Sequence, residues 1–254
     1  MSQDFDRIST VYDETRQPLD SEAVDNLRRF LEHHDWHDLL EVGVGTGRIA
    51  RTLLDCGLRV TGLDASYGML GRAVQKGVTD LVHGTAYQLP FRDGAFDVGL
   101  FVHVLHMLDD PRSALGEAHR VSRHGVLAIV NSPSQDPEAR AQSPRAIVRQ
   151  ALEEAGFPDL LRLGPHVKEQ KILAAYPPAE TSVLSDREIT EPVAKQLDWV
   201  EKRAYRHTLD VPPEVLARAV ATARAKLGDR TTTYRRSEAI VWWPRGTKAA
   251  TAAP

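Results

Sequence analysis

The sequence predicts an α/β fold, a doubly wound arrangement in which helices cover both faces of a mostly parallel sheet of seven strands. Two observations lead to this prediction. Short apolar runs alternate with segments of helical periodicity through the first half of the chain. A glycine-rich turn at residues 43–47 joins the first apolar run to a helix, and the second apolar run ends in an acid, Asp64. This order is typical of a βαβ unit.

Apolar spacing and helix caps set the elements of the first half. Asp20 and Ser21 can cap a helix that ends near His33. Asp110 and Pro111 mark another helix start, and that helix is expected to end at residues 124–125. Further helices are expected at residues 48–54 and around residues 69–74, and strands at residues 39–42, 59–64, 79–82, 96–102 and 126–130.

The second half carries fewer signals. Ser143 and Pro144 open a helix that ends before Gly156, and residues 132–143 are expected to form a surface loop. A sixth strand is predicted at residues 181–190 and a seventh at 231–243, paired as a hairpin-like edge. The sequence predicts two helices between them, at residues 192–206 and 212–227.

Composition excludes several classes of protein. The 254 residues are 42% hydrophobic and carry 32 basic and 35 acidic side chains, so no basic excess points to nucleic acid. The chain has no run of about 18 apolar residues, so no membrane span is expected. The polar N-terminus lacks the apolar stretch of a secretion signal, so a soluble, cytoplasmic protein is expected. His33, His34 and His37 lie at a helix end, where cationic side chains are favoured, so no metal site is expected. The sequence does not determine the oligomeric state, and a homodimer is among the states that it allows.

The glycine turn indicates a ligand. Gly43, Gly45 and Gly47 lack a Cβ, so a ligand can approach the backbone closely, next to the free N–H groups of the following helix. Their GxGxG spacing differs from the dinucleotide pattern GxGxxG, because the third glycine comes one position early. An acid at the end of the second strand, here Asp64, can accept both hydroxyl groups of a ribose.

Several short motifs in order resemble class I S-adenosylmethionine-dependent methyltransferases, and the small-molecule enzymes of ubiquinone and menaquinone biosynthesis in particular. The likeness covers residues 36–131. It implies a Rossmann-like fold with an antiparallel last strand, S-adenosyl-L-methionine as cofactor, a small-molecule acceptor, and a substrate cap at residues 192–228. The motifs are EVGVGTG at 41–47, LDAS at 63–66, HGTA at 83–86, LPF at 89–91, DGAFDV at 93–98 and VLH at 104–106.

The resemblance also implies which residues bind the cofactor. Thr85 departs from the family, which usually has an acid there to accept from the adenine amino group; a threonine hydroxyl can also accept. Tyr12 and Arg16 lie in an opening segment that folds over cofactor and substrate in the family, the alternative being a floppy terminus. The implied set is Tyr12, Arg16, Glu41, Gly43, Gly45, Gly47, Asp64, Ala65, Met69, Thr85, Ala86 and Phe101.

Candidate catalytic residues follow the fourth strand. The cofactor supplies the activated methyl group, so a base is needed only if the acceptor must lose a proton. His103 and His106 suit that task, although a histidine near the position of His106 is common in the family as a structural residue. Phe101, at the end of the same strand, is expected to face the site. Tyr12 could orient the acceptor, and Arg16 could pair with a carboxylate.

Alternatives remain open. Trp199 and Arg203 share a helix face, where they either line an acceptor pocket or pack the insertion, and the sequence favours packing. A nicotinamide-dependent oxidoreductase is the main rival, and a non-catalytic S-adenosylmethionine-binding protein is the third hypothesis. Glu41 ahead of the glycines argues against the oxidoreductase. Methylation of nucleic acid or protein is disfavoured, because residues 101–104 lack the family's base-amine motif.

Overall fold

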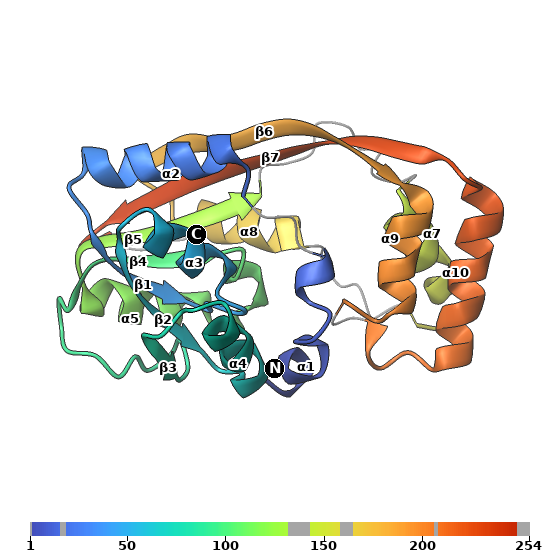
Figure 1. Ribbon diagram of the computed structural model, residues 1–254, viewed down its shortest axis with the longest axis horizontal. Coiled ribbons are helices and arrows are strands. Elements are labelled where there is room, and N and C mark those ends of the chain that lie inside the picture. The colour runs from blue at the N-terminus through green and yellow to red at the C-terminus, as the bar shows by residue number, and fades with distance from the viewer. Residues whose placement is uncertain (1, 16–18, 132–142, 158–164, 206–207, 248–254) are drawn as a thin grey trace, which may run out of the picture.

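One seven-stranded sheet organises the chain (Figure 1). The computed structural model describes residues 2–15, 19–131, 143–157, 165–205 and 208–247. The strand order is β3-β2-β1-β4-β5-β7-β6, which confirms the predicted count of strands. The strands are β1 (Asp38–Val42), β2 (Arg59–Asp64), β3 (Leu81–His83), β4 (Phe96–Val102), β5 (Ser122–Asn131), β6 (Glu180–Pro192) and β7 (Thr231–Pro244).

Strand direction places the ligand-binding edge. The first five strands are parallel, whereas β7 runs antiparallel to both β5 and β6. The mostly parallel sheet with an antiparallel last strand is therefore confirmed. Because parallel strands end at the same edge, the loops that follow β1, β2, β4 and β5 meet there. The chain crosses over between β1 and β4, and ligands of open α/β sheets bind at such a point.

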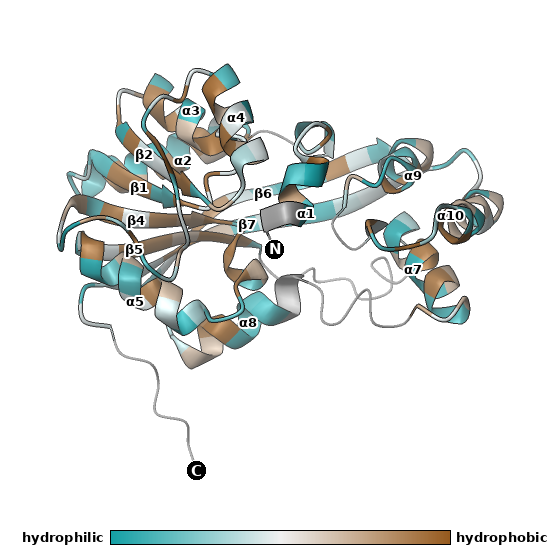
Figure 2. Cartoon of the chain, turned by 90° about the horizontal axis from the view of Figure 1, so that it is seen from below, coloured by the Kyte–Doolittle hydropathy of each residue, from teal (hydrophilic) through white to brown (hydrophobic). Residues whose placement is uncertain are grey.

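Helices cover both faces of the sheet, as Figure 2 shows from below. One face is covered by α2 (Ser21–His33), α3 (Arg48–Asp55) and α4 (Tyr67–Gln75), and the other by α5 (Pro111–Val121) and α8 (Pro165–Ala175). The doubly wound, Rossmann-like architecture that the sequence predicts is confirmed.

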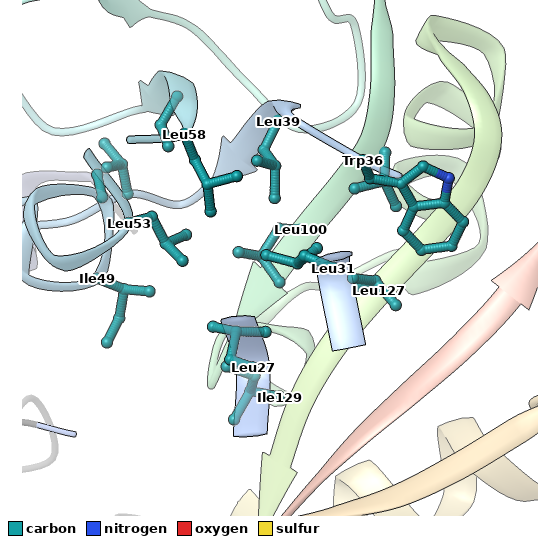
Figure 3. Packing of buried hydrophobic residues seen from close by; sticks show 14 of the residues in the cluster. Leu27, Leu31, Trp36, Leu39, Ile49, Leu53, Leu58, Leu100, Leu127 and Ile129 are labelled. Carbon is teal, nitrogen blue, oxygen red and sulfur yellow. The ribbon is translucent and has the colours of Figure 1, made fainter. Parts of the chain in front are cut away.

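Two apolar cores hold the sheet between these layers. In the first, Leu31 of α2, Leu39 of β1 and Leu100 of β4 are fully buried together (Figure 3). Truncating such a leucine to alanine costs about 2–5 kcal/mol, because the lost contacts add to the cavity left behind. The second core lies under α5 and includes Phe101. Together they fix the strand ends from which the site is built.

The predicted helix caps are present. The N–H of Ala23 donates to the Asp20 carboxylate at 2.7 Å, so α2 begins where the sequence predicts. Asp110 accepts from the Ser113 N–H at 3.1 Å ahead of α5. Ser143 accepts from Ala146 ahead of α7 (Pro144–Glu154). Each cap satisfies an N–H that the helix itself leaves unpaired, which is worth about 1 kcal/mol.

Several elements differ from the expectation, among them α9 (Val193–Glu201), which was expected to end at residue 206. Helix α5 ends at Val121, and β5 begins at the next residue rather than after Gly125. Gly125 lies inside the strand, with φ of +128°, opposite Pro244 of β7. The third strand starts at Leu81 and is only three residues long. Helix α8 is not predicted by the sequence, because its apolar residues do not gather on one side of the helix. Most of the loop expected at 132–143 lies outside the described residues.

Strands β6 and β7 extend beyond the end of the other strands. Strand β5 pairs with β7 as far as Asn131 and Glu238, whereas β6 and β7 continue together to Pro192 and Thr231. This two-stranded extension, here called the arm, leads into a helical module of α7, α9 (Val193–Glu201) and α10 (Pro213–Leu227) (Figure 1). The module has its own apolar core, with Leu152, Leu197 and Val220 fully buried.

The N-terminal segment connects the sheet to the module. It consists of α1 (Ser2–Ile8) and the short 3-10 helix η1 (Asp13–Thr15), and Figure 1 shows α1 between the two regions. Ile8 packs against Met69 of α4 and Leu209 ahead of α10, and Lys202 pairs with Glu14 at 3.1 Å. In the described part of the chain, no helix has the length and apolar character needed to cross a membrane.

Candidate functional site

The glycine turn after β1 adopts a backbone that only glycine accepts easily. Gly43, Gly45 and Gly47 all have left-handed φ, at +78°, +56° and +70°. A Cβ on Gly43 would lie 2.8 Å from Val104, and one on Gly47 would lie 2.8 Å from Ala73, so both positions are also closed by packing. A Cβ on Gly45 meets nothing nearer than 4.0 Å. Gly45 is therefore the glycine of this turn at which an added Cβ would face open space.

Asp64 at the end of β2 is tied to this turn. The Gly45 N–H donates to one carboxylate oxygen at 2.8 Å, and the Ser66 N–H donates to the other at 2.9 Å. Burial raises the pKa of Asp64, and the backbone N–H donors oppose that rise. A carboxylate has about four acceptor positions, and the backbone of Ala65 is a third donor close to this carboxylate, so Asp64 keeps room for a further hydroxyl donor.

Glu41 is a buried carboxyl group beneath the turn. It is 2% exposed, and its Oε2 has no hydrogen-bond partner among the described residues. Burial raises its pKa to about 8, although the positive charge of Arg48 and the N–H of Ala50 act in the opposite direction. A buried acid with an unpaired oxygen is costly, so its presence at the ligand-binding edge is more easily explained by a ligand than by stability.

The N-terminal segment is fastened to the glycine turn by charged groups. Thr46 donates to Asp13 at 2.6 Å, and Lys76 contacts the same carboxylate at 2.5 Å. Asp6 accepts from the Ser66 hydroxyl at 2.6 Å. Tyr12, which is half-buried, interacts electrostatically with Arg48. Arg16 lies outside the described residues.

The other residues that the resemblance implies for cofactor binding differ in their burial and in their contacts. Met69 is 2% exposed and packs under the N-terminal segment. Thr85 is exposed and its hydroxyl accepts from the Tyr87 N–H at 3.3 Å. The exposed Ala65 uses its carbonyl to contact His83 at 3.2 Å, and Ala86 is half-buried.

Phe101 requires a correction. The sequence predicts that its side chain faces the site, but that side chain is 0% exposed and lies in the second apolar core. The reason is strand alternation, which points successive side chains to opposite faces and sends Phe101 under α5. Only the backbone of this residue remains at the edge.

His103 follows β4 with a left-handed φ of +52°. Its Nε2 lies 2.8 Å from Glu238 Oε1, and its Nδ1 lies 3.3 Å from the Asn131 amide nitrogen. Burial alone would raise the pKa of Glu238, but His103 and Arg236 hold it at about 2. Glu238 is therefore a fixed anion at the end of β7.

His106 lies three residues further on, in the 3-10 helix η2 (Leu105–Met107). Its Nδ1 contacts Glu169 Oε1 at 2.9 Å. Glu169 comes from α8 and its side chain is fully buried. The second oxygen of Glu169 accepts from the Asn131 N–H at 3.2 Å. The structure thus brings both predicted histidines to one edge, each against a buried carboxylate.

Comparison with known proteins identifies the core of this site. Residues 40–130 match the sequence profile of the family described as "Methyltransferase domain". This segment is therefore similar to a methyltransferase domain. It holds the glycine turn, Asp64 and both histidines, and its match confirms the resemblance to class I methyltransferases.

Relatives and solved structures agree with this assignment. The chain is 27% identical over 196 residues to O-methyltransferase resE from Aspergillus sclerotiorum, covering 74% of this chain and 71% of the relative. It is 32% identical over 142 residues to demethylmenaquinone methyltransferase from Renibacterium salmoninarum, covering 52% of this chain and 60% of the relative, which is less than two thirds of that enzyme. YcgJ from Bacillus subtilis shares the fold, with a TM-score of 0.53 and 18% identity over 88% of this chain and 99% of that one.

The sequence did not single out four polar residues around the two histidines. Asn131, Glu169 and Glu238 contact a histidine, and Arg236 pairs with Glu238. Three of them come from β7 and α8, where the family motifs have ended. Glu238 did leave a signal, because it directly precedes the apolar run from Ala239 to Trp243 in a predicted strand. Nothing in the sequence of α8 singles out Glu169.

The aromatic residues of the insertion serve packing. Trp199 and Tyr205 are buried in the core of the helical module. Arg203 donates to the carbonyls of Leu209 and Val211, at 2.8 and 2.7 Å, and so closes the turn ahead of α10. The packing interpretation agrees with these contacts; Arg206 lies outside the described residues.

Proposed function

We propose that the chain transfers a methyl group from S-adenosylmethionine to a small-molecule acceptor. One observation carries the proposal: the unpartnered Oε2 of buried Glu41 lies at the same sheet edge as the open space at Gly45. Two relatives bear the names O-methyltransferase and demethylmenaquinone methyltransferase, which support small-molecule methylation here as well. The methyltransferase match favours this reading over a nicotinamide-dependent oxidoreductase or a non-catalytic binding protein.

The residues present fit the cofactor. Asp64 would accept from the ribose hydroxyl groups, and the backbone at Gly45 would allow the cofactor to lie close against the turn. Glu41 would accept from the cofactor's ammonium group with the oxygen that no described residue uses. When bound, S-adenosylmethionine supplies a methyl group already activated by its sulfonium. What remains for the protein is to orient the acceptor, exclude water and remove a proton where necessary.

The acceptor would lie between the methyltransferase domain and the elements outside it. We propose that residues 36–131 form the cofactor-binding core and that residues 192–228, with α7, form the acceptor cap. The N-terminal segment, with Tyr12 at its middle, would cover both ligands. Contacts of that segment with the glycine turn and with the module support this arrangement.

Calorimetric titration with S-adenosylhomocysteine, with NADH in parallel, tests the proposal. We expect binding of the first and none of the second. Asp64→Asn should weaken S-adenosylhomocysteine binding at least tenfold, because an amide puts a donor in place of one carboxylate oxygen. The matched control is Asp55→Asn, an acid that pairs with Arg51 on the surface and should leave affinity unchanged. Binding of NADH alone would overturn the assignment.

A further inference from the structure

The two histidines after β4 differ in which ring nitrogen is available. Nδ1 of His106 contacts Glu169, while its Nε2 has no partner among the described residues and is not buried. In His103, Nδ1 contacts Asn131, while Nε2 is buried 2.8 Å from the Glu238 carboxylate, where a substrate cannot reach it. A histidine can take a proton only at a nitrogen with a free lone pair.

Glu169 is held so that it fixes the His106 ring. Its side chain is fully buried, and its second oxygen accepts from the Asn131 backbone N–H at 3.2 Å. A buried carboxylate accepts hydrogen bonds and cannot donate them, so the nitrogen that faces it must carry the proton. His106 is thereby held as the Nδ1–H tautomer, with its lone pair on Nε2.

Asn131 sets the opposite tautomer in His103. Its amide nitrogen lies 3.3 Å from His103 Nδ1 and 3.5 Å from Glu169 Oε2, so it faces two acceptors at once. Turning the amide over would place its oxygen beside the Glu169 carboxylate, where two acceptors would repel each other. Nδ1 of His103 therefore accepts, which leaves the ring proton on Nε2, 2.8 Å from the Glu238 carboxylate. Because Nε2 is buried between β5 and β7, His103 offers no nitrogen to a substrate.

The position of His106 fits a role at the methyl acceptor. It lies in η2, immediately after β4, where the chain crosses over relative to β1. Val104, two residues earlier, packs against the glycine turn, 2.8 Å from where a Gly43 Cβ would be. The free nitrogen is thus at the same edge as Gly45 and Glu41.

We infer that Nε2 of His106 removes the proton from an acidic hydroxyl group of the acceptor, with Glu169 as the positioning residue. The inference rests on the proposed function. The acceptor's O–H bond breaks, the proton forms the N–H bond at Nε2, and the electron pair stays on the oxygen that is to be methylated. Phenols and enols suit this base, because a phenol with a pKa of about 10, as in Tyr, is within a few units of an imidazole. A neutral amine needs no such step.

The tautomers can be read directly by long-range ¹H–¹⁵N correlation spectra of the imidazole rings in the free, full-length protein. We expect His106 in the Nδ1–H form and His103 in the Nε2–H form. His106→Asn and His103→Gln assign the signals, since each retains an N–H donor near the one removed. Glu169→Gln should move the His106 ring toward the Nε2–H form. An Nε2–H tautomer of His106 in the wild type would overturn the inference.

Turnover gives the second readout. Across a panel of phenols, enols and amines offered with S-adenosylmethionine, we expect methylation at oxygen, with kcat at least 100-fold lower in His106→Asn and KM little changed. His103→Gln should instead lower thermal stability. Preference for an amine, or full activity of His106→Asn, would overturn the inference. Failure to bind S-adenosylhomocysteine would overturn the proposed function and leave the tautomer result standing, so the two failures are distinct.

Discussion

The glycine turn and the histidine cluster lie at one sheet edge but are built in different ways. The turn is made by nearby residues, with the Gly45 N–H reaching Asp64 only 19 positions away. The histidines are held by distant side chains, and Glu169 is 63 positions from His106. The turn is thus fixed by backbone conformation, whereas the cluster depends on the second half of the chain. The proposed cofactor site is therefore set by local geometry, whereas the histidine cluster requires the fold of the whole sheet.

The largest expected effect comes from breaking the turn itself. In Gly47→Ala, the left-handed φ and the overlap with Ala73 should together cost about 3 kcal/mol or more. Gly57→Ala is the matched control, because Gly57 has φ of +82° but nothing within 4 Å of the added Cβ. It should cost about 1–2 kcal/mol. Chemical denaturation measures both, and equal losses would show that packing at Gly47 is unimportant.

Gly45→Ala sharpens the same comparison. Its Cβ meets no atom within contact distance, so its stability should match that of Gly57→Ala. Binding of S-adenosylhomocysteine, however, should fall at least tenfold, because the methyl group fills the space left for the ligand. Calorimetry on the two variants separates the effects. Undiminished binding to Gly45→Ala would move the ligand away from this glycine.

A second effect concerns Glu41 and pH. Its pKa of about 8, against an ordinary 4.5, means that the folded protein holds this proton more tightly than the unfolded chain. The resulting stabilisation is complete below about pH 4.5 and is lost as the pH rises through 8, on the order of a few kcal/mol. Glu41→Gln should flatten this part of the stability profile, as followed by urea denaturation from pH 5 to 9.

Ligand binding should release the proton that Glu41 carries in the free protein. Arg48 and Asp64 face Glu41, and a ligand ammonium group would add a positive charge beside it. We expect S-adenosylhomocysteine binding at pH 7 to release up to one proton, detected by calorimetry in buffers of different ionisation enthalpy. Glu41→Gln should release none from this position. Identical proton release from both proteins would separate Glu41 from the ligand.

The smallest effect is expected at the N-terminal segment. Asp13→Asn weakens the contacts with Thr46 and Lys76, which are half-exposed, so it should cost about 0.5–1.5 kcal/mol and weaken S-adenosylhomocysteine binding a few-fold. Glu14→Gln removes only the exposed contact with Lys202 and should have almost no effect on either. Equal behaviour of the two variants would argue that this segment does not cover the ligand.

Sequence reasoning succeeded where the signal is local. The Asp20 cap of α2 and the bounds of β2 and β4 follow from local signals of a few residues. The turn after β1 was predicted from the close spacing of its three glycines. Phe101 was misplaced because an apolar run buried on both faces does not show which side chain points where.

The partners of the histidines could not be predicted, because they depend on tertiary contacts. Glu169 belongs to a helix without an apolar stripe, and its partner is known only once α8 lies against the end of β4 and β5. The tautomer that we infer for His103 follows from Asn131, which is one residue among many polar ones until β5 and β7 are paired. The sequence named both histidines but could not distinguish their roles.

The arm of β6 and β7 has a mechanical consequence. Past the pair formed by Asn131 and Glu238, only two strands continue, and a two-stranded ribbon twists more readily than a wide sheet. The helical module at the end of the arm has an apolar core of its own, and it is also connected to the sheet through Ile8 and Glu14 of the N-terminal segment. If the proposed function holds, a change in the core of the module would reshape the acceptor cap while leaving the glycine turn in place.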